Sequence, residues 1–525
     1  MAKDILKEIV DARSELIKQK GYSFGFEIPE KRLRKVHPFI QEKGAILEVK
    51  RASPSKGDIA PDLNSFETAL TYAKAGARAI SCLTEPNYFK GTLEDLMNVC
   101  RAADTFENET GKNPPTVLRK DFLTDEQDIE ISYRAGADAV LLIARILSSE
   151  KILSMAKKAE SLGLSVLIEV RKDEDLEKLA VVMQNVNHKN ILCGVNSRDL
   201  KDFTIDMLIP AKMFSKIKNI AQDARITFES GILSARSAAF AASMGFNAIL
   251  LGEAAARNPE KAKEFTAAFE NEAQNSEKNK NGEMWIEYGS CDFGRKNPFV
   301  KICGITNVED ALCAAKNGAD FFGFIFWNKS KRNIAKENVL QIRKSLEENF
   351  KNGRIKKMPK LVGVIVDLEA KETEDALSLV NENVLDIIQV HTFESALKFC
   401  TDERFKNVPH YCAVNISSQE DIQKLDELAR LGEPRILVDA QSQNQIGGTG
   451  KQIDEEILEA VSKKYKLMIA GGISSANVSK IIEKFNPEFL DVSSSLEDSP
   501  SKKNHQKINE FFDIINDISK KQEVI

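Results

Sequence analysis

Acidic and basic side chains stand two residues apart inside short apolar runs in the first half of the chain. Glu48 and Lys50 lie in AILEVKR, and Asn196 and Arg198 lie in ILCGVNSRD. Residues two apart in a β-strand project to the same face, so each pair would act together. A charge on a buried strand is costly unless it is paired or functional, and proton transfer is chemistry that such pairs can perform.

Other apolar runs of the same half also end in polar residues. Lys120 ends TVLRK, Glu169 lies in LIEV, and Glu229 precedes Ser230 in FESG. In a barrel of parallel strands the carboxyl ends share one mouth, which is where active sites are assembled. A rim of structural salt bridges is the alternative, and for any one residue it is the better interpretation. The set as a whole favours a catalytic mouth.

The second half offers a different group of residues. Cys303 in KICGIT and Asp439 in ILVDA each end an apolar run, and Arg332 follows another run in SKRNI. A lone strand cysteine is more often core filler than catalyst, and Asp439 alone could be a helix cap. The place of Cys303 just before Gly304 favours a position at a barrel mouth over a role as core filler.

These side chains need strands to hold them, and the apolar runs recur at the spacing of β–α units. Eight runs fall between 46 and 252, and eight more fall between 299 and 495. Near-continuous apolar strands separated by helix-sized segments indicate parallel sheets buried on both faces. The count of eight favours closed barrels over doubly wound sheets. The predicted fold is α/β, two tandem (β/α)8 TIM barrels.

Length and composition are typical of two globular units. The chain has 525 residues, more than a single core normally supports, with 42% hydrophobic and 29% charged residues. We expect a first domain at 1–272 with extra N-terminal helices over 1–45, a linker at 273–297, and a second domain at 298–525. The linker prediction rests on the polar, charged start of that stretch and its lack of a sustained period.

Charge and cysteine usage exclude several kinds of partner. The net charge of −5 and the pI near 5.9 argue against nucleic acid or a membrane surface. The eight cysteines show no C-x-x-C spacing, so neither a zinc site nor a disulfide framework is suggested, and a reducing cytoplasm fits. The N-terminus has no apolar signal core. We expect small-molecule substrates, no metal and a cytoplasmic location; the oligomeric state stays open, with a monomer as the default.

Glycine-rich turns repeat at the seventh and eighth strand ends of both halves. Gly231 is followed 21 residues later by Gly252, and Gly472, next to Gly471, is followed 21 residues later by Ser493. In this fold those two loops commonly form a phosphate site, because glycine lets the backbone approach and helix-start N–H groups bind anions. Chance similarity of such turns is the alternative. The repeat of this pattern in both halves favours a phosphate site in each.

The motifs of the first half resemble indole-3-glycerol-phosphate synthase. They are ILEVKRASPSKG (46–57), LRKDF (118–122), LIEV (167–170), GVNSRDL (194–200), ESGI (229–232) and LLGEA (250–254), in the order of the family. The resemblance covers essentially residues 1–270. It implies ring closure of a carboxyphenylamino-deoxyribulose phosphate with loss of carbon dioxide and water.

This resemblance implies a role for each strand-end residue. Lys120 would be the general acid of the condensation, and Glu169 would handle a proton in the dehydration. Lys50, held by Glu48, would contact the substrate carboxylate and could act as the second acid. The remaining predicted site residues are Asn196, Arg198, Glu229 and Ser230 around the anthranilate ring and hydroxyls, and Ser53, Gly231, Gly252 and Glu253 near the phosphate.

The second half resembles phosphoribosylanthranilate isomerase. The matching strings are KICGIT (301–306), SKRNI (330–334), IQVH (388–391), LVDA (437–440), GGTGK (447–451), AGGIS (470–474) and DVSSS (491–495). The implied reaction is an Amadori rearrangement of an aminoaldose to an aminoketose. By resemblance Asp439 is the acid, Cys303 is the base as a thiolate of lowered pKa, and Arg332 holds the anthranilate carboxylate. The other implied substrate contacts are His391, Gly471, Gly472, Ser493 and Ser494, with GGTGK as a mobile loop that closes over substrate.

Two residues depart from the isomerase pattern, and two alternatives stay open. Thr392 and Ser495 stand where the family usually has glycine, which could weaken phosphate binding without abolishing it. The chain could instead be another phosphosugar isomerase or aldolase pair, with Lys120 as a Schiff-base lysine. One barrel could also be an inactive scaffold. No cofactor is implied, because the proton chemistry needs none.

Overall fold

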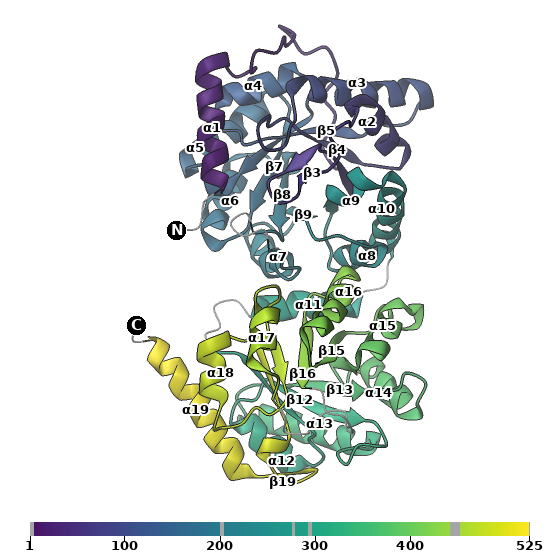
Figure 1. Ribbon diagram of the computed structural model, residues 1–525, viewed down its shortest axis with the longest axis vertical. Helices are drawn as coiled ribbons and strands as arrows, with labels where there is room; N and C mark the ends of the chain where they lie inside the picture. The colour runs from purple at the N-terminus through teal and green to yellow at the C-terminus, as the bar shows by residue number, and fades with distance from the viewer. Residues whose placement is uncertain (1–4, 200–203, 276–278, 292–296, 441–451, 524–525) are drawn as a thin grey trace. The chain divides into compact units, whose positions relative to one another are not determined.

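Two compact units make up the chain, Met1–Lys278 and Asn279–Ile525. Each contains a closed barrel of eight parallel strands, which confirms the predicted fold class (Figure 1). No helix among the described residues is long and apolar enough to cross a membrane. The computed structural model describes residues 5–199, 204–275, 279–291, 297–440 and 452–523.

The first barrel closes where its first strand pairs with both its second and its last. Leu47 is in register with Ile80 on one side and with Leu251 on the other. A short antiparallel pair, β2 (Ala52–Ser53) and β3 (Gly57–Asp58), follows the first strand. The barrel strands are β1 (Gly44–Val49), β4 (Ala79–Leu83), β5 (Thr116–Lys120), β6 (Ala139–Ile143), β7 (Ser165–Val170), β8 (Ile191–Asn196), β9 (Arg225–Glu229) and β10 (Ala248–Leu251).

Several helices of this unit begin at a polar residue whose side chain caps the first turn. Thr92 accepts a hydrogen bond from the backbone N–H of Asp95, and the Asp95 side chain accepts one from the backbone of Thr92, which forms a capping box. The helices after β1 are α2 (Ser65–Lys74), α3 (Leu93–Thr110), α4 (Glu126–Arg134), α5 (Ser149–Ser161), α6 (Asp173–Asn185), α7 (Ile209–Ile220), α8 (Ala235–Ser243), α9 (Glu253–Arg257) and α10 (Pro259–Gln274), with short 3₁₀ turns η1 (Ala144–Ile146) and η2 (His188–Asn190).

We expected extra helices over 1–45, but the described residues 5–43 contain a single helix, α1 (Ile5–Lys20). The rest of that segment carries Pro29 and Pro38, and proline disfavours a helix interior. Arg32 and Arg34 instead pin it to the barrel, each with a guanidinium nitrogen 2.9 Å from a carboxylate oxygen of buried Asp138.

The second barrel closes in the same way, with Phe299 in register with Phe489 across the first and last strands. A short hairpin, β19 (Glu497–Ser499) and β20 (Lys502–Lys503), follows the last strand. The barrel strands are β11 (Phe299–Cys303), β12 (Phe321–Phe326), β13 (Lys360–Ile365), β14 (Ile387–His391), β15 (His410–Ile416), β16 (Ile436–Ala440), β17 (Met468–Ala470) and β18 (Phe489–Val492).

Helices pack around these strands and share a continuous apolar core with them. Fully buried Phe322 and Phe324 of β12 and Phe511 of the last helix belong to that core. The helices after β11 are α12 (Val308–Lys316), α13 (Lys336–Lys351), α14 (Lys371–Asn381), α15 (Phe393–Thr401), α16 (Ile422–Arg430), α17 (Glu455–Ser462), α18 (Val478–Phe485) and α19 (His505–Glu523), with 3₁₀ turns η3 (Glu403–Phe405), η4 (Gln419–Asp421) and η5 (Ser494–Leu496).

The stretch predicted as a linker contains a helix, α11 (Lys280–Cys291), that belongs to the second unit. Its buried residues include Asn281, Trp285 and Tyr288, spaced as one helical face. The Tyr288 ring lies 5.0 Å from that of Phe299, and Asn281 accepts a hydrogen bond from the backbone N–H of His410 at 3.3 Å. The linker prediction missed α11 because this buried face is only two turns long and follows a polar run.

Candidate active site

Every residue predicted for the first site lines one cavity at the carboxyl end of the first barrel. These residues come from different strands and from the loops that follow them, as expected for this fold. They are Glu48, Lys50, Ser53, Lys120, Glu169, Asn196, Arg198, Glu229, Ser230, Gly231, Gly252 and Glu253.

Glu48 and Lys50 form an ion pair at the end of β1. Lys50 Nζ lies 2.5 Å from Glu48 Oε2, and the two side chains are 15% and 3% exposed. A Cβ on Gly252 would stand 2.6 Å from Glu48 Oε2 and 2.8 Å from Lys50 Nζ. Because Gly252 has no Cβ, the Glu48–Lys50 pair has room beside it. Lys50 lines the cavity with its ammonium group.

Lys120 at the end of β5 points between two carboxylates. Its Nζ lies 3.4 Å from Glu229 Oε2 and 3.7 Å from Glu169 Oε2. Burial works to lower the pKa of Lys120, but Glu229, Glu169 and Glu48 outweigh it and raise that pKa above its usual value. Lys120 is therefore protonated at neutral pH, which is the state that a general acid needs.

Glu229 is the most deeply buried carboxyl of this cluster, at 1% exposure. Burial raises its pKa to about 7, against the opposing charge of Lys120 and with the help of Glu169. The neighbouring strand makes room for it, because a Cβ on Gly194 would lie 2.0 Å from Glu229 Oε1. Glu229 can therefore take up or release a proton near neutral pH.

Asn196 links the acidic cluster to the next loop. Its Nδ2 donates to Glu169 Oε1 at 3.5 Å, and its Oδ1 accepts from the backbone N–H of Arg198 at 3.0 Å. Arg171 donates to the Asn196 carbonyl at 2.6 Å and so fixes the strand end. Burial lowers the pKa of Arg198. The side-chain amide of Asn196 is therefore oriented by a contact at each of its two polar atoms.

One wall of this cavity is apolar and was not predicted from the sequence. Ile5, Leu6 and Ile9 of α1 line it, and so do Phe89 and Phe122, whose rings lie 6.0 Å apart. Such a wall suits an aromatic ring held beside a charged cluster. The amphipathic pattern of the N-terminal helix was visible in the sequence, but not the surface against which it packs.

A buried arginine fixes α1 at the cavity. Arg13 Nε lies 3.2 Å from Asp121 Oδ1, and its NH2 lies 2.5 Å from Asp128 Oδ1, with all three side chains at most 1% exposed. In Figure 1, α1 accordingly lies beside α4, which carries Asp128. Asp121 directly follows Lys120, so the same network holds the strand end that carries Lys120.

Every residue predicted for the second site lines a cavity at the carboxyl end of the second barrel. The loops after β17 and β18 contribute glycines and serines, and the strands contribute the titratable groups. These residues are Cys303, Arg332, His391, Asp439, Gly471, Gly472, Ser493 and Ser494.

A buried lysine that the sequence analysis missed lies at the centre of this barrel. Lys301 Nζ donates to Gln389 Oε1 at 2.5 Å and to Asp491 Oδ2 at 2.6 Å, and it lies 3.5 Å from Cys303 Sγ. Tyr411 also donates to Gln389 Oε1, at 2.8 Å. Lys301 stands two residues before Cys303, so both side chains project to one face of the strand. The same spacing identified Glu48 and Lys50 as a pair.

The prediction that the pKa of Cys303 is lowered is wrong. Burial raises the pKa of the thiol, and the charge of Asp491 adds to that effect. Lys301 and Lys503 act in the opposite direction but do not outweigh burial. The thiolate is therefore the minor form of Cys303 at neutral pH.

Asp439 has the properties of a carboxylic acid that titrates near neutrality. Burial and the charge of Asp491 raise its pKa to about 7. Its Oδ2 lies 3.6 Å from His391 Nε2, and its Oδ1 accepts from the backbone N–H of Ala440 at 2.8 Å. Burial and the nearby charge of Lys301 lower the pKa of His391 to about 4, so this imidazole is neutral at pH 7.

Arg332 is paired within the chain in this structure. Its Nε and NH2 donate to the two oxygens of Glu497 at 2.9 and 2.7 Å. Lys503 Nζ lies 2.8 Å from Glu497 Oε1 and donates to the carbonyl of Cys303 at 2.6 Å. If Arg332 takes a substrate carboxylate, Lys503 can keep the charge of Glu497 compensated.

The two departures from the isomerase pattern differ in their backbone geometry. Thr392 has φ 80° and ψ 147°, a region that glycine adopts easily and a β-branched residue does not. Ser495 is not among the residues with positive φ, and its hydroxyl donates to the carbonyl of Ile473 at 2.5 Å. Serine therefore fits at 495. The predicted GGTGK loop (447–451) lies outside the described residues.

Thr392→Gly is expected to raise the free energy of unfolding by about 1 kcal/mol. Removing the Cβ relieves the positive-φ conformation, while a glycine at the helix cap loses only a few tenths. Chemical denaturation of the second unit measures the change. Thr392→Ala is the matched control, since it keeps the Cβ and loses the hydroxyl that accepts from Ser395, so it should lower stability. Equal effects of the two variants would contradict the argument.

Comparison with known proteins gives a separate match for each half. Residues 10–267 match the family model "Indole-3-glycerol phosphate synthase", and residues 300–514 match "N-(5'phosphoribosyl)anthranilate (PRA) isomerase". A "Multifunctional tryptophan biosynthesis protein" of Schizosaccharomyces pombe is 32% identical over 91% of this chain, which spans 60% of that relative.

Two further similarities each cover one half. An "Indole-3-glycerol phosphate synthase" of Aliarcobacter butzleri is 35% identical over 50% of this chain and 97% of the relative. A crystal structure of phosphoribosyl anthranilate isomerase from Thermotoga maritima is 29% identical, with a TM-score of 0.35, over 42% of this chain and 99% of that one.

Proposed function

We propose that this chain catalyses two consecutive steps of tryptophan biosynthesis. The chain belongs to the indole-3-glycerol phosphate synthase family, and a region that matches phosphoribosylanthranilate isomerase follows the synthase region in the sequence. The second barrel converts N-(5-phosphoribosyl)anthranilate into 1-(2-carboxyphenylamino)-1-deoxyribulose 5-phosphate. The first barrel closes that product to indole-3-glycerol phosphate. The main support is that each barrel mouth gathers the proton-handling groups its reaction requires.

In the first barrel, Lys120 gives a proton to the ketone oxygen as the ring carbon attacks. Its raised pKa keeps it charged, and Glu229 and Glu169 hold its ammonium group in place. Lys50 receives the substrate carboxylate, whose loss restores the aromatic ring. Glu169 then moves the proton of the dehydration. Ser53 and the loops of Gly231 and Gly252–Glu253 hold the phosphate.

The environment of Lys120 argues against the Schiff-base alternative. A lysine that attacks a carbonyl must be neutral, and such lysines normally have a lowered pKa. The pKa of Lys120 is raised, because three carboxylates outweigh its burial. Borohydride with substrate should therefore leave Lys120 unmodified, which intact-mass measurement can check.

In the second barrel, Asp439 protonates the ring oxygen of the aminoaldose and Cys303 takes the proton from the carbon next to the imine. Arg332 binds the anthranilate carboxylate, and the loops of Gly471–Gly472 and Ser493–Ser494 bind the phosphate. His391, neutral at pH 7, lies beside Asp439 and contributes no charge. Lys301 beside Cys303 favours the thiolate when it forms.

The isomerase kcat/KM is expected to rise about tenfold per pH unit up to about pH 7 and then level off. The reactive form needs Asp439 protonated and Cys303 ionised, and the first has the lower pKa. Below pH 7 the thiolate fraction grows while the acid stays protonated. Above pH 7 the loss of the acid offsets the further gain in thiolate. Initial rates at low substrate across this range measure the profile, and a decrease between pH 5 and 7 would contradict it.

One experiment tests the proposed function as a whole. The purified chain is given N-(5-phosphoribosyl)anthranilate alone, and indole-3-glycerol phosphate is sought by mass spectrometry. Its appearance requires both barrels to work, which also excludes an inactive scaffold in either half. Consumption of the substrate without the indole product would limit the proposal to the isomerase. We place the protein in a reducing cytoplasm, which would keep the thiol of Cys303 available.

A further inference from the structure

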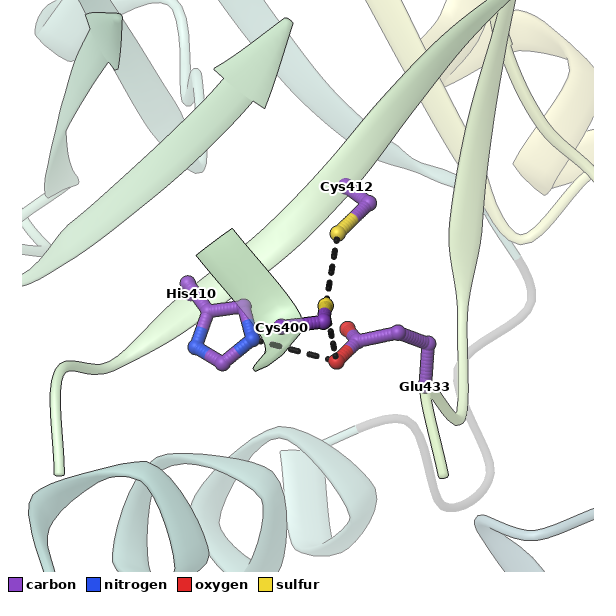
Figure 2. A group of neighbouring side chains, drawn as sticks. All are labelled: Cys400, His410, Cys412 and Glu433. Carbon is purple, nitrogen blue, oxygen red and sulfur yellow. Dashed lines mark hydrogen bonds and ion pairs between the residues drawn. The ribbon is translucent and has the colours of Figure 1, made fainter. Parts of the chain in front are cut away.

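Four metal-ligating side chains converge at the end of the second barrel opposite to its mouth. Cys400 lies near the end of α15, His410 and Cys412 lie in the first three residues of β15, and Glu433 lies in the loop before β16. All four are buried, at 0–4% exposure. Figure 2 shows their side chains pointing toward one another from these three segments. The proposed isomerase chemistry uses none of them.

The spacing of their donor atoms is close to that of a tetrahedral site. Cys400 Sγ lies 3.7 Å from Cys412 Sγ and 3.3 Å from Glu433 Oε1, and His410 Nε2 lies 3.1 Å from Glu433 Oε1. Zinc bonds of about 2.0–2.3 Å in tetrahedral geometry place neighbouring ligand atoms about 3.4–3.8 Å apart. All four donor atoms lie within 4.8 Å of one another, so the widest pair has to close by about 1 Å.

The imidazole of His410 is oriented as a metal ligand would be. Its Nδ1 lies 2.7 Å from the carbonyl oxygen of Val408, which can only accept, so Nδ1 carries the proton. That leaves Nε2 facing the carboxylate of Glu433 at 3.1 Å. Two acceptors at this distance need a proton or a cation between them. A backbone carbonyl on the outer nitrogen is the usual support of a metal-bound histidine.

We propose that Cys400, His410, Cys412 and Glu433 bind one zinc ion that fastens α15, β15 and the loop before β16 together. Thiolates, imidazole and carboxylate all bind zinc, and four protein ligands leave no open position, as in a structural site. Binding displaces the two thiol protons and the proton between His410 and Glu433, and the bound ion leaves a net charge of −1. Because the strand starts lie away from the barrel mouth, the ion takes no part in the proposed catalysis.

The surroundings of the cluster support a structural role. The ring of Phe399 lies 4.9 Å from the His410 ring and stacks on Phe405 at 4.3 Å. Asn281 of α11 accepts from the backbone of His410, so this helix covers the same region. Buried ligands behind aromatic rings and a helix exchange slowly with solvent. The ion should therefore enter as the chain folds and remain through purification.

Elemental analysis of the intact chain tests the proposal. The chain is purified without chelators, under reducing conditions and after removal of any histidine tag. We expect about one zinc ion per chain, and about a tenfold loss or more in Cys412→Ser and His410→Asn. Cys193→Ser is the matched control, because Cys193 is equally buried on a strand of the other barrel, and it should keep the ion.

A second measurement keeps the test independent of whether the variants fold. Wild-type chain refolded with Co²⁺ should show the visible bands of a tetrahedral ion and a near-ultraviolet thiolate charge-transfer band. Zinc-free wild-type protein that also gives no such bands would overturn the proposal. So would an anaerobically purified chain whose mass is lower by two hydrogen atoms through a Cys400–Cys412 disulfide. Loss of zinc in the Cys193→Ser variant as well would also contradict the assignment.

Discussion

Lys120→Ala is expected to lower the formation of indole-3-glycerol phosphate by at least about 10²–10⁴-fold. The variant removes the group proposed to protonate the ketone oxygen, and it leaves Glu229 and Glu169 without the charge between them. Like charges at that distance raise each other's pKa, so the dehydration step should suffer too. The measurement supplies 1-(2-carboxyphenylamino)-1-deoxyribulose 5-phosphate directly and follows the indole product.

The same sample contains an internal control, since Lys120 lines only the first cavity. Consumption of N-(5-phosphoribosyl)anthranilate by Lys120→Ala should stay within about twofold of wild type. Lys178→Ala is a matched variant, because Lys178 donates to the carbonyls of Ala144 and Leu147 and does not line the cavity. Near-normal indole production by Lys120→Ala, or equal losses in both variants, would rule out the assignment.

Cys303→Ala should abolish the rearrangement in the second barrel while leaving ring closure in the first. The thiol is proposed as the only base at the carbon next to the imine, so its removal should cost about 10²–10⁴-fold in kcat. Lys301 would also lose the neighbour at 3.5 Å that its charge stabilises as a thiolate. Cys303→Ser restores the shape but offers a hydroxyl, which is a much weaker base.

The control for this loss is another cysteine of the same barrel. Cys313 lies on α12, is partly exposed and does not line the cavity. Cys313→Ala should therefore turn over N-(5-phosphoribosyl)anthranilate as wild type does. Unchanged turnover by Cys303→Ala would remove the cysteine from the mechanism. A parallel loss of indole production from added aminoketose would mean that the substitution had damaged more than one barrel.

The positions of the site residues could be predicted because the barrel has a simple rule for them. A polar residue at the carboxyl end of a buried parallel strand, on the face turned toward the barrel axis, points into the mouth. Glu48 and Lys50 illustrate this, since their same-face spacing indicated the ion pair that the structure contains. The electrostatic state of Cys303 could not be predicted in the same way. It depends on burial and on Asp491, which lies 188 positions further along the chain.

Groups assembled from distant or separate segments were the hardest to predict. The prediction of no metal rested on local cysteine spacing, whereas the proposed zinc ligands are brought together by the packing of α15 on β15 and the pairing of β15 with β16. Lys301 was missed although its spacing from Cys303 followed the same rule as the pair on β1. Its role became clear only from its contacts with Gln389 and Asp491.

The position of α11 decides how the two halves can be produced as separate fragments. A boundary placed at residue 298, where the first strand of the second barrel is about to begin, would discard Trp285 and Tyr288. The aromatic surface around Phe299 would then face water, and such a fragment should aggregate when expressed. A truncation that starts at Asn279 keeps this cover, and would be the better starting point for crystallisation or directed evolution of that half alone.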